Sequence, residues 1–548
     1  MEMDRRSFVK GGVAFGSLAA MGVLTACSPA APKEDSQPPT TAEAESPATS
    51  SAPVVPDHFT DGKWIGRVMG HRDYLTVSVE VRGGDIANIQ MLRCDETIGI
   101  GTVAAPIMAA RILADKNLDV DTVSGATRTS LAVRDAVAAA IEAAGGNPAD
   151  YQKGAPAPAA AQTVTEDVDV VVVGGGTAGL VAAVRLLESG KKVTVVEKLE
   201  IPGGSGNMTY SGVVAVNSKM QTEYIQGRIT DANRTSFDMD AMMAYSTAGV
   251  DPQNARTPGE APFIETLFGT SASLVDWMQS IGVGFLTMGS PAAGVLPTLA
   301  PGFYMGGAGH CMSFMADRVT ALGGNLHYSV KMTEFIKDSD GKIAGIKAEG
   351  VRDGSAYTIN AKAVCMATGG FAANKDMLKQ YYPDYADFSF NCCPGSTGEG
   401  MQMAIEEGAV TECMGRPLGA FCSVTPDAAG SRFEVAFLHM FAPGIMVNND
   451  GSEFGNGFMS HAFMAEAVMD PANGNRFFQI TDYAGSLTLE KMDSWQCTDY
   501  DCLFSRGDIV RFETVEEAAE VLKLPNLPEA VAKHNEHALA GDLDEFGR

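Results

Sequence analysis

The sequence predicts a multidomain protein in which a small α+β module precedes a larger α/β domain. Residues 63–92 alternate apolar and polar side chains, as the strands of a half-buried sheet do, and two helical segments follow them. Further along, the strand Val168–Val173, apolar except for Asp169, runs into a glycine-rich turn and a helix, which is typical of parallel βαβ units. The length of 548 residues fits roughly three domains.

The N-terminus carries an export signal. Arg5 and Arg6 precede an apolar run, residues 13–23, which is too short to span a bilayer and is typical of a signal peptide. Paired arginines indicate the twin-arginine translocase, which exports folded cargo. Residues 1–27 end in a sequence that resembles a lipobox, so we expect Cys27 to be acylated. A plain cleavage site with an incidental cysteine is the alternative.

Residues 28–56 are rich in Pro, Ala, Ser and Thr and cannot bury a core, so we expect a flexible, disordered tether. Together with the lipid, this tether predicts an extracytoplasmic protein anchored to the cell membrane.

Composition excludes several classes of protein. The net charge of −27 argues against nucleic acid as a partner and against a basic patch for anionic lipid. The ten cysteines include no C-x-x-C-H and no C-x-x-C pair, so we expect neither an attached haem nor a metal site. Cys392 with Cys393, and Cys497 with Cys502, are expected to be buried thiols, with oxidation in an extracytoplasmic setting as the alternative, and we assign the vicinal pair no role.

The small module is expected over residues 57–148. The pattern predicts three strands and two helices in it, over residues 63–69, 75–81, 86–92, 106–113 and 130–144. A second linker, residues 149–164, follows, so we expect the module to be movable relative to the rest of the chain.

The stretch Asp121–Ser130, DTVSGATRTS, places a tight turn at the start of the second of these helices. Unpaired backbone N–H groups and the helix dipole favour a phosphate at such a position. Gly125 lets the backbone approach a ligand, and Ala126 adds little bulk, so the Thr127 hydroxyl is expected to stand exposed beside that phosphate. An ordinary Ser/Thr helix cap is the alternative.

This stretch resembles the flavinylation motif of FMN-binding domains, in which an Asp and an S-G-A-T run mark the Thr that receives FMN as a phosphoester. The matching residues are Asp121, Ser124, Gly125, Ala126, Thr127 and Thr129. The resemblance implies covalent FMN on Thr127, attached by a flavin transferase during maturation.

The larger domain opens with a G-x-G-x-x-G turn between a strand and a helix. The turn contributes Gly174, Gly176, Thr177, Ala178 and Gly179, and Glu197 ends the second strand. The glycines permit the turn, the approach of a pyrophosphate and close packing of the helix, while the acidic residue accepts a hydrogen bond from a ribose hydroxyl. The pattern therefore predicts a Rossmann-like dinucleotide site.

Four glycine-rich blocks follow, at residues 203–205, 211–212, 361–377 and 395–404. In this order and roughly this spacing, they resemble the FAD domain of soluble fumarate reductases, urocanate reductase and related flavoproteins. The residues that this resemblance assigns to FAD are Lys198, Gly204, Ser205, Ala367, Thr368, Gly369, Gly370, Thr397, Gly398 and Glu399. It implies noncovalent FAD, an FAD-binding domain over residues 165–417 and an inserted α+β capping domain over residues 418–548.

The same resemblance implies a reaction. Electrons enter through FMN, pass to FAD and leave as hydride to the C=C bond of an enoate such as fumarate or urocanate, which an acid then protonates. We expect an FAD/FMN-dependent reductase acting on CH–CH groups, fed in anaerobic respiration by a quinol- or flavin-linked membrane donor. A non-catalytic flavin electron carrier and a ketosteroid-type flavin dehydrogenase are the alternatives.

The capping segment departs from the family's pattern. Glu453 stands where the family has an Arg, Gly457 replaces a Glu, and His461 falls at the position of the catalytic Arg. His461 could donate a proton near neutral pH, or it could lie on a loop that repacked once the Arg was lost. Loss of that cation predicts a substrate larger or less charged than fumarate. Further polar candidates, each expected to be structural, are His310, His439 and Arg476.

Residues 505–548 resemble the helical end of the capping domain, after which family members return to the FAD domain. We expect that final FAD-domain segment to be absent, either in a fragment of a longer reading frame or in a shortened protein.

Overall fold

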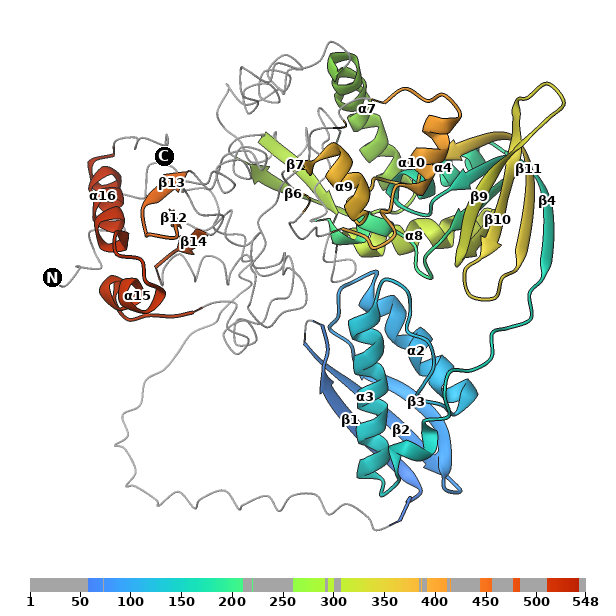
Figure 1. Ribbon diagram of the computed structural model, residues 1–548, viewed down its shortest axis with the longest axis horizontal. Coiled ribbons are helices and arrows are strands. Elements are labelled where there is room, and N and C mark those ends of the chain that lie inside the picture. The colour runs from blue at the N-terminus through green and yellow to red at the C-terminus, as the bar shows by residue number, and fades with distance from the viewer. Residues whose placement is uncertain are drawn as a thin grey trace, which may run out of the picture.

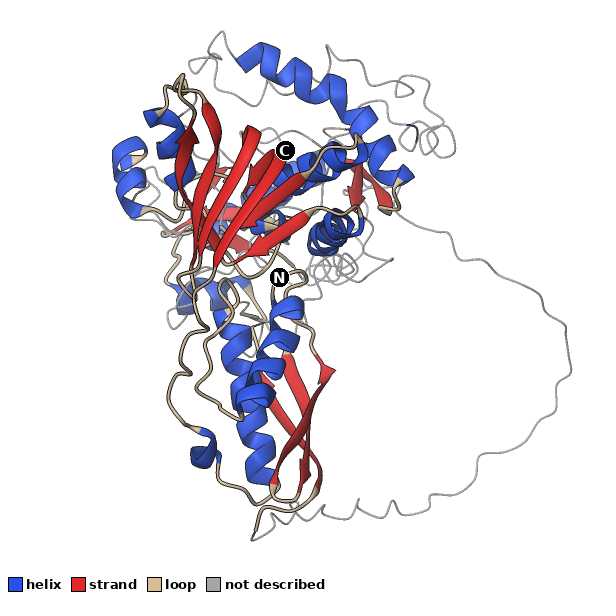
Figure 2. Ribbon diagram, turned by 90° about the vertical axis from the view of Figure 1, so that its right-hand side faces the viewer, coloured by secondary structure: helices blue, strands red, loops and turns tan. Residues whose placement is uncertain are grey.

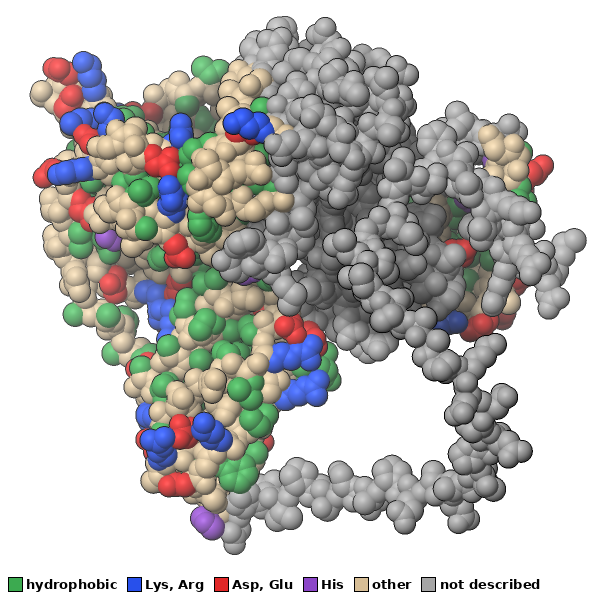
Figure 3. Space-filling model, turned by 180° about the vertical axis from the view of Figure 1, so that it is seen from behind, with side chains coloured by type: hydrophobic (Ala, Val, Ile, Leu, Met, Phe, Trp, Pro, Cys, Tyr) green, Lys and Arg blue, Asp and Glu red, His purple; other side chains and the backbone are tan. Residues whose placement is uncertain are grey.

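The computed structural model describes residues 58–71, 73–209, 219, 260–290, 294–299, 307–383, 386, 392–411, 414, 444–455, 477–482 and 510–541. A three-stranded module and a larger domain built on a six-stranded sheet lie next to each other (Figure 1). The module occupies one end of the molecule, below the larger sheet in the view of Figure 2. On the face shown in Figure 3, acidic and basic side chains are interspersed over the described surface.

The module's sheet is antiparallel, with its strands in sequence order: β1 (Gly62–Met69), β2 (Tyr74–Arg82) and β3 (Asp85–Arg93). Gly83 and Gly84 join the last two strands, and both have positive φ, as a two-residue hairpin with the right twist requires. The Asp61 carboxylate accepts hydrogen bonds from both glycine N–H groups, which fixes the turn.

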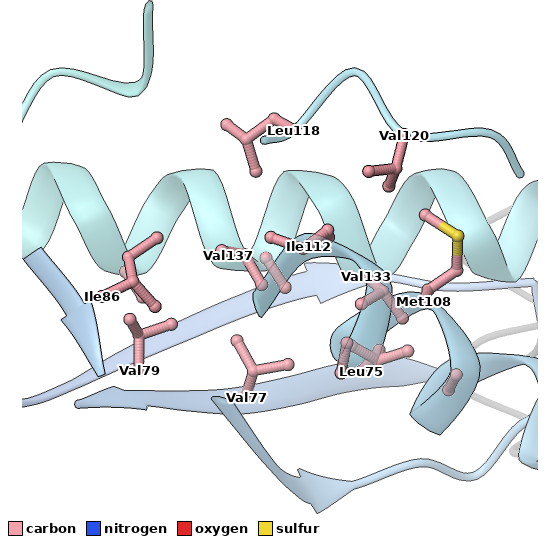
Figure 4. Packing of buried hydrophobic residues seen from close by; sticks show 14 of the residues in the cluster. Leu75, Val77, Val79, Ile86, Met108, Ile112, Leu118, Val120, Val133 and Val137 are labelled. Carbon is pink, nitrogen blue, oxygen red and sulfur yellow. The ribbon is translucent and has the colours of Figure 1, made fainter. Parts of the chain in front are cut away.

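The module's core lies between this sheet and the helices α2 (Gly101–Asp115) and α3 (Thr127–Ala143) (Figure 4). Alternate residues of β2 and residues one helical turn apart on α3 meet there: Leu75, Val77, Val79, Val133 and Val137. The short 3₁₀-helix η2 (Pro148–Tyr151) adds the buried ring of Tyr151 to the same core.

Both helices of the module begin earlier than their patterns predict. α2 starts at Gly101 instead of Pro106, because the Thr97 carbonyl accepts the Gly101 N–H at 2.7 Å and the added turn buries Ala104 and Ala105 in the core. The helix tolerates Pro106 in its interior at the cost of one backbone hydrogen bond. α3 likewise starts at Thr127 instead of residue 130.

The larger domain is a mixed sheet of order β8-β5-β4-β11-β10-β9. Its parallel strands are β4 (Thr163–Val173), β5 (Val193–Glu197), β8 (Asn325–Tyr328) and β11 (Ala356–Met366). The antiparallel strands β9 (Val330–Lys337) and β10 (Ile343–Gly350) complete one edge. All five residues of β5 are buried, as a central parallel strand requires.

Helices pack against this sheet and bury one core with it. They are α4 (Thr177–Glu188), α7 (Glu260–Ser280) and α8 (Gly307–Ala321). The fully buried Leu180 of α4 and Met315 of α8 meet Val172 of β4 in that core. This confirms the predicted α/β domain and places the glycine-rich turn after β4 at the carboxyl edge of the sheet, where doubly wound folds bind ligands.

The remaining described elements are short. Near the larger sheet lie η3 (Gly204–Met208), β6 (Phe285–Ser290), β7 (Gly294–Leu299), α9 (Lys375–Tyr381) and α10 (Glu399–Glu406). A separate group lies away from that sheet: β12 (Ile445–Asn448), β13 (Glu453–Gly455), β14 (Phe477–Ile480), α15 (Val515–Leu522) and α16 (Leu527–Ala540) (Figure 1). Within the described ranges, every helix is too short or too polar to cross a membrane.

Candidate functional site

The predicted anion turn forms at the start of α3. Gly125 has φ +90°, and Ala126 at the N-cap provides no side-chain hydrogen bond to the first turn. Ser130 braces the turn from the buried side, because its hydroxyl accepts from the Val123 N–H at 3.1 Å and donates to the Ala126 carbonyl at 2.9 Å. Thr127 is left exposed at the helix N-terminus, where a phosphoester on its hydroxyl would meet the positive end of the helix dipole.

Glu96 is a site residue that sequence reasoning missed. Its carboxylate is 2% exposed and accepts hydrogen bonds from the Thr129 hydroxyl at 2.5 Å and the His71 N–H at 2.8 Å. Thr129 lies two residues beyond Thr127, so Glu96 fixes the first turn of α3 from behind. No local pattern distinguishes Glu96 from the neighbouring Asp95, and its partners are distant in sequence.

Asp121, the first residue of the motif, contacts the larger domain. Its side chain is 62% exposed and forms an ion pair at 3.3 Å with Arg352 of the larger domain. Ser124 is also exposed, on the same loop.

The dinucleotide turn is built by close backbone contacts. Gly174 has φ +107°, and a Cβ there would lie 2.3 Å from the Ala367 carbonyl oxygen. A Cβ on Gly179 would lie 1.9 Å from the Gly174 oxygen, so α4 packs directly on the end of β4. Gly176 differs from both, because its Cβ would have only the Gly203 oxygen nearby, at 3.8 Å. The middle glycine therefore faces open space, as a pyrophosphate site requires.

Glu197 lies directly behind this turn and is 6% exposed. Its two carboxylate oxygens accept the N–H groups of Gly175 at 2.7 Å and Leu199 at 2.8 Å. Burial raises its pKa, against the lowering effect of these hydrogen bonds. A carboxylate has about four acceptor positions, so Glu197 can brace the turn and still accept from a ribose hydroxyl.

Lys198, directly after β5, contacts the predicted glycine-rich segment that contains Thr397 and Glu399. Its ammonium group donates to the Thr397 hydroxyl at 2.5 Å and the Glu399 carboxylate at 2.7 Å. Lys331 of β9 lies 3.3 Å from the other oxygen of Glu399. Asn374 donates to the Thr397 carbonyl at 2.9 Å, so the loop before α10 is held from both sides.

The other predicted glycine-rich segments lie beside the same loop before α10. Ser205 Oγ lies 3.4 Å from Ser396 Oγ and accepts the Cys393 N–H at 3.2 Å, while a Cβ on Gly400 would touch Thr368. The remaining predicted residues lie on these loops or at the start of α4: Thr177, Ala178, Gly204, Ala367, Gly369, Gly370 and Gly398.

These residues fit FAD. Gly370 has open space where a side chain would begin, as Gly176 does, so the two loops leave room for a ligand. The Asn207 side-chain oxygen is buried and finds no hydrogen-bond partner within the described part of the chain. A cradle of bare backbone with an unsatisfied buried acceptor is what a bound dinucleotide would complete.

The ion pair at Glu399 predicts a pH-dependent stability. Burial raises the Glu399 pKa, but the hydrogen bonds from Lys198 and Thr397 outweigh it and lower the pKa to about 2. The contribution is therefore complete above about pH 4.5 and is lost as the pH falls toward 2. We expect Glu399→Gln to lower the Tm at pH 7 by the equivalent of roughly 0.5–1 kcal/mol, since the group is partly exposed.

Calorimetry of both proteins from pH 7 down to pH 3 checks this prediction. The difference in Tm should shrink below about pH 4.5. Glu334→Gln, which removes the more exposed ion pair with Lys347, is the matched control and should change Tm less. A Glu399→Gln deficit that stays constant with pH contradicts the assignment.

The proposed substrate residues fall mostly outside the described residues. This applies to Gly457, His461, His439 and Arg476, as it does to Cys27 and to the Cys497 and Cys502 pair. Glu453 begins β13, across the Gly451 turn from β12, and His310 is half-buried near the start of α8. Cys392 and Cys393 are free thiols whose pKa values are raised by burial.

The fold and the two sites define a flavoprotein oxidoreductase with an FMN module and an FAD domain. Residues 169–489 match the family model "FAD binding domain" and residues 70–142 match "FMN-binding domain". Since the first match spans more than half of the chain, the chain belongs to the FAD binding domain family. The presence of an FMN-binding domain and an FAD-binding domain is thereby confirmed.

Curated relatives include urocanate reductase of Eggerthella lenta, 27% identical over 99% of this chain and 85% of its own length. NADH:acrylate oxidoreductase of Vibrio harveyi is 26% identical over 90% of this chain, and fumarate reductase (cytochrome) of Shewanella frigidimarina is 27% identical over 70%. The chain covers 53% and 63% of the lengths of these last two relatives.

Solved structures support the fold. The open conformation of a flavocytochrome c3 fumarate reductase matches 70% of this chain and 64% of its own with a TM-score of 0.51 and 24% identity. A 3-ketosteroid dehydrogenase from Rhodococcus jostii RHA1 matches 71% of this chain and 82% of its own with a TM-score of 0.52 and 19% identity.

Proposed function

We propose that this chain is an extracytoplasmic flavoprotein reductase that passes electrons from FMN on Thr127 to FAD and then, as hydride, to the C=C bond of an unsaturated carboxylate or related small molecule. The observation that carries the proposal is the similarity to urocanate reductase over 99% of the chain, which includes the FMN module. The acrylate and fumarate enzymes among the relatives support the same reaction class.

The chain's own residues supply position and electrostatics. Thr127 tethers one flavin, and the Gly174–Gly179 turn together with Glu197 and Lys198 holds the other. When bound, the flavins supply the redox chemistry itself. In this proposal His461 is the candidate proton donor, since an imidazole exchanges a proton near neutral pH.

The cellular setting is part of the proposal. Arg5, Arg6 and the lipobox-like residues 24–27 support export through the twin-arginine translocase and acylation of Cys27. A membrane donor and a flavin transferase then act on the exported or maturing protein. Fractionation tests this: Cys27→Ser should move the protein from the membrane to the soluble extracytoplasmic fraction, and unchanged membrane association would reject the anchor.

Anaerobic photoreduction of the purified protein, followed by a panel of enoates, tests the activity. Reoxidation of the FAD by urocanate, acrylate or another enoate supports the proposal. If every enoate leaves the FAD reduced while FMN still exchanges electrons, the chain is an electron carrier instead. Turnover of a 3-ketosteroid in place of the enoates would establish the dehydrogenase alternative.

A further inference from the structure

Four charged residues meet where the FMN module contacts the FAD domain. The module contributes Arg111 of α2 and Asp121, and the larger domain contributes Glu200, after β5, and Arg352, between β10 and β11. Glu200 lies between the two guanidinium groups, 2.7 Å from Arg111 and 3.2 Å from Arg352. Arg352 also pairs with the Asp121 carboxylate at 3.3 Å, and Arg111 donates to the Asp121 carbonyl at 3.0 Å. Charges of opposite sign therefore alternate across the contact.

Burial divides this cluster into a strong half and a weak half. The side chains of Glu200 and Arg111 are 8% and 18% exposed, whereas those of Arg352 and Asp121 are 39% and 62% exposed. Removing Glu200 leaves the Arg111 guanidinium without a carboxylate partner, and removing Arg111 leaves Glu200 only the more exposed Arg352, so either change is costly. The exposed pair is screened by salt and contributes little. We therefore expect Arg111 and Glu200 to dominate.

A second contact, independent of these charges, joins the same two bodies. Asn207 donates from its side-chain amide to the Gly99 carbonyl of the module at 3.1 Å. A Cβ on Gly309 of α8 would lie 2.1 Å from the Ile98 carbonyl oxygen, so backbone touches backbone there. Such close contact requires one specific docked geometry, because a small rotation would separate the backbones or make them clash.

The flavinylation turn itself rests on the FAD domain. A Cβ placed on Gly125 would lie at ordinary van der Waals distance, 3.7 to 3.9 Å, from Leu199, Pro394 and Ile201. These residues flank Lys198 and the loop that precedes Thr397. A flavin carried by the turn is thus placed beside the loops that hold FAD.

We propose that Arg111, Asp121, Glu200 and Arg352 form a docking latch, which seats the FMN module on the FAD domain with its flavinylation turn facing the FAD loops. Residues 152–162, which connect the two bodies outside any helix or strand, allow the module to leave when the latch opens. The docking follows from the contacts alone. Its use, to bring the two flavins within electron-transfer distance, rests on the proposed function.

Amide hydrogen exchange on the full-length, flavin-loaded protein tests the latch. Glu200→Gln and Arg111→Met should each accelerate exchange at residues 98–100 and 206–208 by about tenfold or more, while amides of β2 and β4 keep their protection. The double variant should show little further acceleration, because both substitutions break the same pair. Arg134→Met, which removes an exposed ion pair with Asp135, is the matched control and should leave those segments unchanged.

Exchange at those segments that is the same in Glu200→Gln, Arg111→Met and the parent overturns the latch. If Arg111→Met loses protection in β2 as well, Glu200→Gln, which preserves side-chain shape, decides the question. The rate at which reduced FMN reduces FAD is measured on the same proteins. It should be lower in the variants whose docking is weakened. If no enoate is ever reduced but exchange responds as expected, the latch stands and the proposed reaction fails.

Discussion

Thr127→Ala is expected to abolish covalent flavin on the protein. The Thr127 hydroxyl is exposed at an uncapped helix N-terminus, and the matching motif assigns it the phosphoester bond to FMN. Alanine removes the only atom to which the phosphate would be attached, and it is a good helix former, so the module should fold unchanged. In protein made by cells that contain a flavin transferase, the fluorescent band in a denaturing gel should disappear completely.

Thr122→Ala is the matched control for this experiment. Thr122 lies in the same loop, five residues earlier in the sequence, but outside the S-G-A-T run. The control should keep full fluorescence and the FMN adduct in the mass of the intact protein. A fluorescent band that persists in Thr127→Ala would assign the flavin to another residue.

The second large effect is expected from Gly176→Val. Gly176 has φ −79°, which any residue can adopt, and its Cβ would meet only the Gly203 oxygen at 3.8 Å. The valine therefore fits the protein without FAD but occupies the space where a pyrophosphate approaches the backbone. We expect FAD affinity to fall roughly 100-fold, equivalent to about 3 kcal/mol of overpacking, with little change in fold.

Fluorescence titration of the FAD-depleted protein with FAD measures this effect. Gly269→Val, on the exposed face of α7 with no atom within 4 Å of the new Cβ, is the control and should bind FAD normally. Circular dichroism of both variants should match the parent. Parental FAD affinity in Gly176→Val would place the dinucleotide elsewhere.

Local patterns predicted the parts of the molecule whose chemistry is local. The turn around Gly176 follows from a strand, a glycine spacing and a helix, all within a short segment, and the structure confirms that turn. The turn before Thr127 could be predicted for the same reason. The predicted start of α2 at Pro106 was wrong. Burial of Ala104 and Ala105 in the core outweighs the usual preference of proline for the first turn of a helix.

Contacts between distant residues were beyond sequence reasoning. The carboxylate of Glu96 is joined to the Thr129 hydroxyl across 33 positions, and Arg111 is joined to Glu200 across 89. No periodicity or motif encodes such pairs, because the topology of the fold alone brings them together. His461 falls outside the described residues, so its role in protonation stays a prediction.

Separate measurement of bound and released flavin tests the central claim that one chain carries both cofactors. Acid precipitation of protein from its native host should leave about one FMN per chain in the pellet and release about one FAD into the supernatant. A pellet without flavin, or a supernatant without FAD, would contradict the account.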